Sequence, residues 1–170
     1  QDTASSSSLV AMVAARERAT SGEANKKGCK QNLTVYTSSQ SHSSIEKAAK
    51  IAGIGTNNFR IINIDENYAI NSDHLLNTIK QDIKKGFTPA LIIATVGTTS
   101  STGIDPVDQI GKICKKYNIW LHVDSAMAGP AAICPELRFV NNGLEFADSY
   151  TFNPHKWMLT NFDCSIFYVR

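Results

Sequence analysis

Lys156 and Asp124 are the two residues whose type and position most suggest chemistry. Lys156 stands between a histidine and a tryptophan in the segment FNPHKWML, directly after the strand-like run ADSYTF. Asp124 ends the apolar run IWLHVD and is followed by the small residues Ser125 and Ala126. Each also has an ordinary explanation, because most lysines are solvated and a buried aspartate is commonly satisfied by backbone N–H groups.

Taken together, the lysine and the aspartate suggest pyridoxal phosphate. An amine that forms an imine and a carboxylate that holds a protonated ring nitrogen are the two groups that this cofactor requires. The serine-rich segment around Ala4, Ser5 and Ser6 could supply N–H groups and hydroxyls for a phosphate. Ordinary helix capping by serine and threonine explains the same segment equally well.

Helices and strands alternate along the chain in a way that would position these groups. Apolar periodicity predicts helices within 3–20, 41–55, 72–85 and 105–117, and strands over 32–38, 59–64, 89–96, 119–124 and 147–152. This alternation predicts an α/β domain with a mostly parallel sheet and helices on both faces. Ligands of such sheets bind outside the carboxyl ends of the strands, where Thr98 and Thr99, Asp124 and residues 153–156 fall.

Local signals give finer predictions for the helices. Ser43 and Glu46 have the spacing of a capping box, and Asp105 and Pro106 resemble an N-cap and the first residue of a helix. The buried face of the helix over 72–85 is expected to comprise Leu75, Leu76, Ile79 and Ile83.

Composition bounds the class of protein. The chain has 170 residues, of which 42% are hydrophobic and 19% charged, so it fits one globular domain. The net charge is +2 and the basic residues are scattered, which favours neither a nucleic-acid nor a membrane partner. Without a leader or a long apolar run, we expect a soluble, cytoplasmic protein. Four widely spaced cysteines predict free thiols and no metal site: Cys29, Cys114, Cys134 and Cys164.

Six segments carry a resemblance to a known family: DTASSSSLVAMVAARERA, QSHSSIEKAAKIAG, ATVGTTSSTGIDPV, IWLHVDSAMAGPAAICPELR, FADSYTFNPHKW and NFDCS. Together they resemble the pyridoxal-phosphate-dependent aromatic-L-amino-acid decarboxylases, including the plant tyrosine and tryptophan decarboxylases. The resemblance runs through essentially all 170 residues, in order and with fitting spacing.

The resemblance implies catalytic and ring-binding roles for five residues. Lys156 would bind the cofactor covalently, and Asp124 would pair with the ring nitrogen. Thr99 would contact the cofactor and Ala126 would lie under its ring. His42 would stack on the opposite ring face and approach the substrate carboxylate.

The resemblance also implies a phosphate site. Ala4 and Ser5 would bind the phosphate from the helix start, with Asn153 and His155 close to it. We further expect the bulky residues after Lys156 to shield its amine from water, which together with a nearby cation would lower its pKa.

The resemblance implies that residues 1–170 are the central portion of the large domain of an aspartate-aminotransferase-like enzyme. The chain starts without methionine and stops in a strand-like run, so we expect an N-terminal arm and a C-terminal domain outside it. The intact enzyme would be a homodimer that decarboxylates an aromatic amino acid of the tyrosine, tryptophan or dihydroxyphenylalanine type, and this segment alone would be inactive. Met127 and Leu137 depart from the tyrosine and phenylalanine that the family usually has.

Three alternatives stay open at this point. An aromatic aldehyde synthase, which couples decarboxylation to oxidative deamination, would carry the same motifs. A glutamate or histidine decarboxylase would share the cofactor and the fold. A truncated, inactive copy could persist only as an interaction module.

Overall fold

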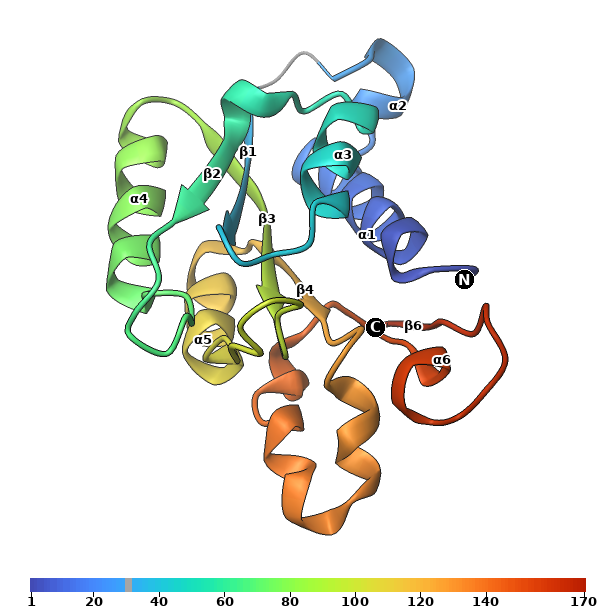
Figure 1. The fold of residues 1–170 in the computed structure, drawn as a ribbon. Coiled ribbons are helices and arrows are strands. Elements are labelled where there is room, and N and C mark those ends of the chain that lie inside the picture. Colours follow the sequence, from blue (N-terminus) through green and yellow to red (C-terminus); the bar gives the residue numbers. More distant parts are fainter. Residues whose placement is uncertain (30–31) are drawn as a thin grey trace.

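The computed structural model describes residues 1–29 and 32–170, which form a six-stranded sheet covered by helices (Figure 1). The strands are β1 (Leu33–Ser38), β2 (Phe59–Ile62), β3 (Thr88–Thr95), β4 (Trp120–Asp124), β5 (Ser149–Phe152) and β6 (Ile166–Val169). Their order is β2-β1-β3-β4-β5-β6, and only the β5–β6 pair is antiparallel. The predicted mostly parallel sheet is confirmed.

Helices lie on both faces of this sheet. They are α1 (Ala4–Ala19), α2 (Glu23–Lys27), α3 (Ser44–Ile51), α4 (Ser72–Lys84), α5 (Val107–Tyr117) and α6 (Pro154–Trp157). Short 3₁₀ helices span Thr56–Asn58, Gly129–Ile133, Pro135–Asn141 and Leu144–Phe146. Figure 1 shows α1 and α3 against one face, and α4 and α5 against the other. Both faces of the central parallel strands β1, β3 and β4 are therefore buried, as such sheets require.

Strand β3 shows how one apolar run serves two cores. Leu91 and Ile93 pack with residues of α1 and α3, such as Met12, whereas Ile92 packs with residues of α4 and α5. All three strand residues are fully buried, because successive side chains of a strand point to opposite faces. The unbroken apolar pattern thus correctly predicted a central strand.

The predicted capping box at the start of α3 is wrong. Ser43 has helical backbone angles and its side chain makes no cap hydrogen bond, whereas a capping residue needs an extended backbone. The imidazole Nδ1 of His42 instead accepts a hydrogen bond from the backbone N–H of Ser44, at 3.2 Å. Glu46 forms an ion pair with Lys50 at 2.8 Å.

The predicted N-cap role of Asp105 is also wrong. The residue preceding α5 is Pro106, and Asp105 is buried. Its two oxygens accept hydrogen bonds from the backbone N–H groups of Ile70 and Thr95, each at 2.7 Å. Both carboxylate oxygens are thus used in hydrogen bonds to distant parts of the chain. Asp105 thereby connects the end of β3 to the segment before α4.

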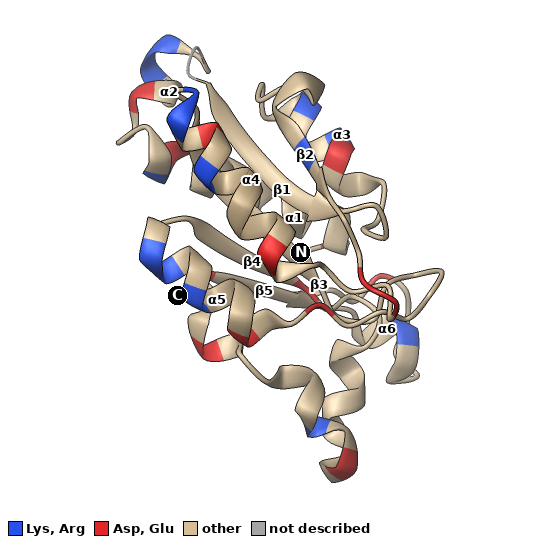
Figure 2. Cartoon of the chain, turned by 90° about the vertical axis from the view of Figure 1, so that its left-hand side faces the viewer, with Lys and Arg blue, Asp and Glu red and all other residues tan. Residues whose placement is uncertain are grey.

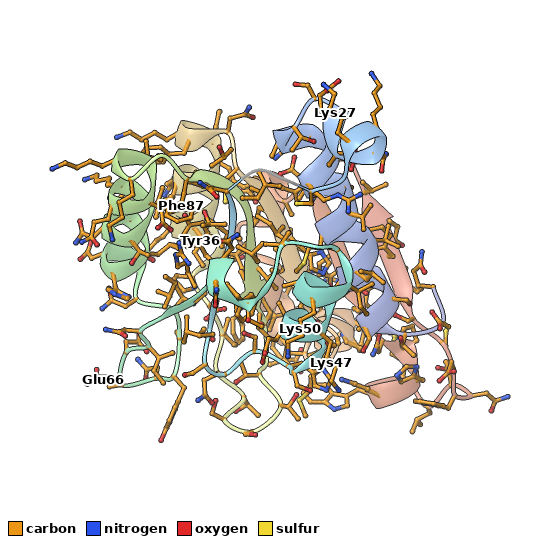
Figure 3. The ribbon with its side chains drawn as sticks, turned by 90° about the horizontal axis from the view of Figure 1, so that it is seen from above. Lys27, Tyr36, Lys47, Lys50, Glu66 and Phe87 are labelled. Carbon is orange, nitrogen blue, oxygen red and sulfur yellow. The ribbon has the colours of Figure 1, made fainter. Side chains whose placement is uncertain are left out.

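The buried face of α4 differs from the prediction at two positions, and at the first of them Leu76 is only partly buried. Ile83 is 45% exposed, and Asp82 occupies the buried position beside it. Arg60 donates to the Asp82 carboxylate from Nε at 2.9 Å, and the hydroxyl of Tyr36 donates to it at 2.8 Å. The Arg60 guanidinium also lies 4.9 Å from the ring centre of Phe87, which Figure 3 shows near Tyr36. A buried carboxylate is tolerated here because a cation and a hydroxyl pair with it.

The surface carries interspersed charges. Figure 2 shows lysines and arginines alternating with acidic residues over the helices. Within residues 1–29 and 32–170, no helix combines the length and the apolar character needed to cross a bilayer. The four cysteines are free thiols, and Cys114 is buried.

Candidate active site

A cavity of about 250 Å³ lies at the carboxyl ends of β3, β4 and β5. Its lining includes all nine residues that the sequence singled out: Ala4, Ser5, His42, Thr99, Asp124, Ala126, Asn153, His155 and Lys156. They come from the start of α1 and from the segments that follow β1, β3, β4 and β5. Parallel strands deliver these segments to one edge of the sheet, so residues far apart in sequence meet there.

The cavity has a buried floor and an exposed rim. Asp124, Ala126 and Asn153 are buried. Lys156 and His42 are exposed, together with Ser5 and Thr99. The Lys156 amine therefore stands at the rim, whereas the Asp124 carboxylate belongs to the buried floor.

The prediction that bulky neighbours shield Lys156 is wrong. Trp157 is 51% exposed and Leu159 is 100% exposed, and Lys156 itself is exposed. Helix α6 is a single turn, and no element in the described part of the chain covers these side chains. Sequence neighbours do not shield one another when they follow a short, protruding turn.

Asp124 is an unusual carboxylate because it is buried with little compensation. It is 4% exposed, and its Oδ1 accepts a hydrogen bond from the backbone N–H of Ala126 at 3.0 Å. Burial raises its pKa, while the Ala126 N–H and the nearby Lys156 and His42 act in the opposite direction. A cationic partner in the cavity would strongly favour its ionised form.

His42 is held in one tautomer by the start of α3. Its Nδ1 accepts from the backbone N–H of Ser44 and lies 2.8 Å from the Ser44 hydroxyl. In neutral imidazole one nitrogen accepts and the other donates. The proton of neutral His42 is therefore on Nε2, which makes this nitrogen a hydrogen-bond donor.

His155 and Asn153 are oriented by the segment before β6. The backbone N–H of Cys164 donates to His155 Nδ1 at 2.9 Å, and the hydroxyl of Ser165 donates to Asn153 Oδ1 at 2.7 Å. The His155 ring also packs against Phe162, with ring centres 4.5 Å apart. In the part of the chain that the structure describes, each side chain keeps a donor without a partner, namely Nε2–H of His155 and the NH₂ group of Asn153.

The start of α1 contains a capping box and also backbone N–H groups that have no acceptor within the helix. The hydroxyl of Thr3 accepts from the Ser6 N–H at 3.3 Å, and the Ser6 hydroxyl accepts from the Thr3 N–H at 3.4 Å, which together form a capping box. Ordinary capping therefore explains Ser6. Ala4 and Ser5 are in the first helical turn, where N–H groups have no acceptor within the helix, and both residues line the cavity. Such a helix start favours an anion.

Several lining residues were missed in the sequence: Thr3, Ser44, Thr95, Gly97 and Phe162. Gly97 could have been found, because a glycine directly after a buried strand often marks a close approach. Its φ is +79°, and an added Cβ would lie 2.5 Å from the Cβ of Ala128. Thr95 has a buried hydroxyl with no hydrogen-bond partner in the described part of the chain.

The donor set of this cavity fits pyridoxal phosphate. An amine at the rim suits an aldehyde, and a buried carboxylate suits a protonated ring nitrogen. The first turn of α1, with the donors of His155 and Asn153, suits a phosphate. The buried, partnerless hydroxyl of Thr95 indicates a further polar contact in this region.

Comparison with known proteins agrees with this assignment. The family model described as the pyridoxal-dependent decarboxylase conserved domain matches residues 1–170. Tryptophan decarboxylase 2 of Oryza sativa subsp. japonica is 46% identical over 100% of this chain and 34% of its own length. The corresponding values for phenylacetaldehyde synthase of Arabidopsis thaliana are 44%, 100% and 35%.

Solved structures agree as well. The crystal structure of Catharanthus roseus tryptophan decarboxylase in complex with L-tryptophan matches with a TM-score of 0.91 and 40% identity, over 99% of this chain and 36% of that one. The chain thus spans about a third of the length of the relatives that it matches. Because the family model covers the whole chain, this protein belongs to the pyridoxal-dependent decarboxylase family.

Proposed function

We propose that the intact protein decarboxylates an aromatic L-amino acid, with pyridoxal phosphate as cofactor, to give the arylalkylamine and CO₂. The observation that carries this proposal is the meeting of Lys156 and Asp124 with seven further candidate residues around one cavity. The identity of 46% to a tryptophan decarboxylase supports the substrate class. Residues 1–170 would be the central portion of the cofactor-binding large domain.

The residues of the cavity have distinct proposed roles in holding the cofactor. Lys156 would hold it covalently, and Asp124 would accept a hydrogen bond from its ring nitrogen. Thr99 and Ala126 would contact the ring from the segments that follow β3 and β4. The phosphate would lie at the first turn of α1, against Ala4 and Ser5, with Asn153 and His155 beside it.

The chain's own groups would then prepare the carboxylate of the substrate for loss. When bound, pyridoxal phosphate supplies an electron-poor ring that accepts the electron pair left behind as CO₂ departs. The charge of Asp124 keeps the ring nitrogen protonated, and this preserves the ring's electron demand. His42, with its proton on Nε2, would donate to the substrate carboxylate and orient it for departure.

A label-mapping experiment tests this proposal. Borohydride reduction of the intact protein with pyridoxal phosphate, followed by peptide mapping, should place the label on Lys156, and Lys156→Ala should abolish it. Lys47→Ala is a matched control, because Lys47 is also exposed but does not line this cavity. A label on another lysine would refute the role of Lys156. The absence of any label would refute the proposal and favour an inactive copy.

A second candidate function is an aromatic aldehyde synthase, because a phenylacetaldehyde synthase is 44% identical over the whole chain. The two activities consume the same substrates but differ in products. Assays of CO₂, amine, aldehyde and peroxide on a panel of tyrosine, tryptophan, dihydroxyphenylalanine, histidine and glutamate would separate them. Amine without aldehyde supports the first proposal, and aldehyde with peroxide supports the second.

The exposed apolar side chains beside the cavity support a homodimer. Four large apolar side chains close in sequence to Lys156 are exposed, and exposed apolar groups that cluster in this way are typical of an interface: Trp157, Met158, Leu159 and Phe162. We propose that a second copy of the protein covers them. Light scattering of the intact protein should give the dimer mass, and Leu159→Glu should shift it toward the monomer.

The four cysteines bear on the cellular compartment. Free thiols favour a reducing compartment, and we propose the cytoplasm.

A further inference from the structure

Thr95 has a polar group that the proposed roles leave unused. It is the last residue of β3 and lines the cavity, yet it is only 5% exposed. Its hydroxyl is buried and has no hydrogen-bond partner among the described residues. Buried hydroxyls nearly always form a hydrogen bond, so we expect the Thr95 hydroxyl to have a hydrogen-bond partner when the cofactor is bound.

The backbone of Thr95 is fixed on both sides. Its N–H donates to the carboxylate of Asp105 at 2.7 Å, and its carbonyl accepts from the backbone N–H of Asp105 at 3.0 Å. Asp105 is itself buried and also holds Ile70. Thr95 can therefore change its contacts only by rotating its side chain about χ1.

Asp124 is the neighbour of Thr95 across the sheet. The two residues are register partners on β3 and β4, and both line the cavity, so their side chains lie on the same side. An ionised carboxylate can accept about four hydrogen bonds, but among the described residues Asp124 accepts one, from Ala126. Among the described residues, the Thr95 hydroxyl thus has no acceptor, and the neighbouring Asp124 carboxylate can accept further hydrogen bonds.

We propose that Thr95 is a positioning residue for Asp124. With the cofactor bound, the Thr95 hydroxyl donates to the Asp124 carboxylate, which keeps it ionised and oriented toward the ring nitrogen. This inference rests on the proposed function, because it needs a cation at Asp124.

Other charged groups also act on Asp124 and must be held constant in any test. Lys156 from α6 and His42 from the segment after β1 favour its ionised form. His155 lines the same cavity, and the Asp105 carboxylate accepts a hydrogen bond from the backbone N–H of Thr95. None of them is altered in Thr95 variants, so a change of pH dependence in such variants reports on the hydroxyl.

The test compares Thr95→Val with Thr95→Ser in the intact protein. Binding of pyridoxal phosphate is measured by absorbance and equilibrium dialysis from pH 5 to 8. Thr95→Val should bind about tenfold more weakly, as expected for a lost hydrogen bond to a charged group. Its affinity should also begin to fall at a higher pH than in the wild type, because protonated Asp124 cannot pair with the ring nitrogen. Thr95→Ser keeps the hydroxyl and should match the wild type.

A matched control and a second variant keep the result interpretable. Thr34→Val removes a buried threonine hydroxyl on β1 that bonds to Tyr36 at 2.7 Å, away from the cavity. It should lower thermal stability and leave the pH dependence of cofactor binding unchanged. Thr95→Ala, which adds no bulk, should reproduce Thr95→Val even if valine perturbs packing.

Two outcomes would overturn the inference while leaving the proposed function standing. One is a wild-type affinity and pH dependence in both Thr95→Val and Thr95→Ala. The other is an equal shift in Thr95→Ser, which would assign the effect to the methyl group. Failure of the wild type itself to bind pyridoxal phosphate would overturn the proposed function together with this inference.

Discussion

Replacing Asp124 with asparagine should affect the empty and the cofactor-loaded protein in opposite directions. In the empty protein, the carboxylate is buried and accepts one hydrogen bond from within residues 1–29 and 32–170, and burial raises its pKa. A raised acid pKa means that ionisation at neutral pH costs folding free energy. Asparagine keeps an oxygen for the N–H of Ala126 and carries no charge. The empty variant should therefore unfold at a temperature no lower than that of the wild type.

The loaded variant should lose function. In the proposed complex, the carboxylate and the protonated ring nitrogen would be opposite charges joined by a hydrogen bond, at a residue that is only 4% exposed. Removing one well-placed electrostatic stabiliser of this kind costs about 3 kcal/mol. This corresponds to a fall in turnover of about a hundredfold or more. Retention of the cofactor should weaken as well, because its ring nitrogen loses its anionic partner.

The assay combines turnover at saturating cofactor with thermal unfolding of the empty protein. Asp148→Asn is a matched control, because Asp148 pairs with Arg18 at 2.7 Å and does not line the cavity. That variant should lose stability and keep its turnover, which is the opposite pattern. Near-normal turnover in Asp124→Asn would show that the ring nitrogen has another partner. A lower unfolding temperature of the empty variant would refute the argument from burial.

Three further predictions concern other residues. His42→Phe should lose turnover and retain cofactor affinity in a dialysis assay, because phenylalanine can stack but cannot donate; lost affinity with normal turnover would reverse the assignment. Asp82→Ala should destabilise the protein by about 3–5 kcal/mol in urea unfolding, since Arg60 is left without its buried partner, and a loss below about 1 kcal/mol would contradict this. Burial raises the pKa of Asp105 from 3.8 to about 6, so its contribution to stability should decline by about 3 kcal/mol as pH rises from 4 through 6. The difference in unfolding free energy between wild type and Asp105→Asn, measured across that range, should show this slope, and a flat difference would contradict it.

Local patterns in the sequence were sufficient for much of the fold. Helical periodicity marked α1, α3, α4 and α5 to within a few residues, because one face of each helix is buried against the sheet. The apolar run of β3 predicted a central strand, since parallel strands are covered on both faces. Strand ends then indicated where Asp124 and Lys156 should meet, and the cavity contains both.

Side-chain partners and exposure were decided only by the tertiary structure. Asp105 has the sequence context of an N-cap, yet its carboxylate accepts hydrogen bonds from backbone N–H groups that are 35 and 10 residues away in the sequence. Asp82 is buried because Arg60, 22 residues earlier, reaches it from β2. Lys156 has bulky neighbours in sequence but stands exposed, because shielding depends on which element packs over a residue. Periodicity records which face of an element is apolar, whereas hydrogen bonds and shielding depend on contacts between elements that only the folded chain brings together.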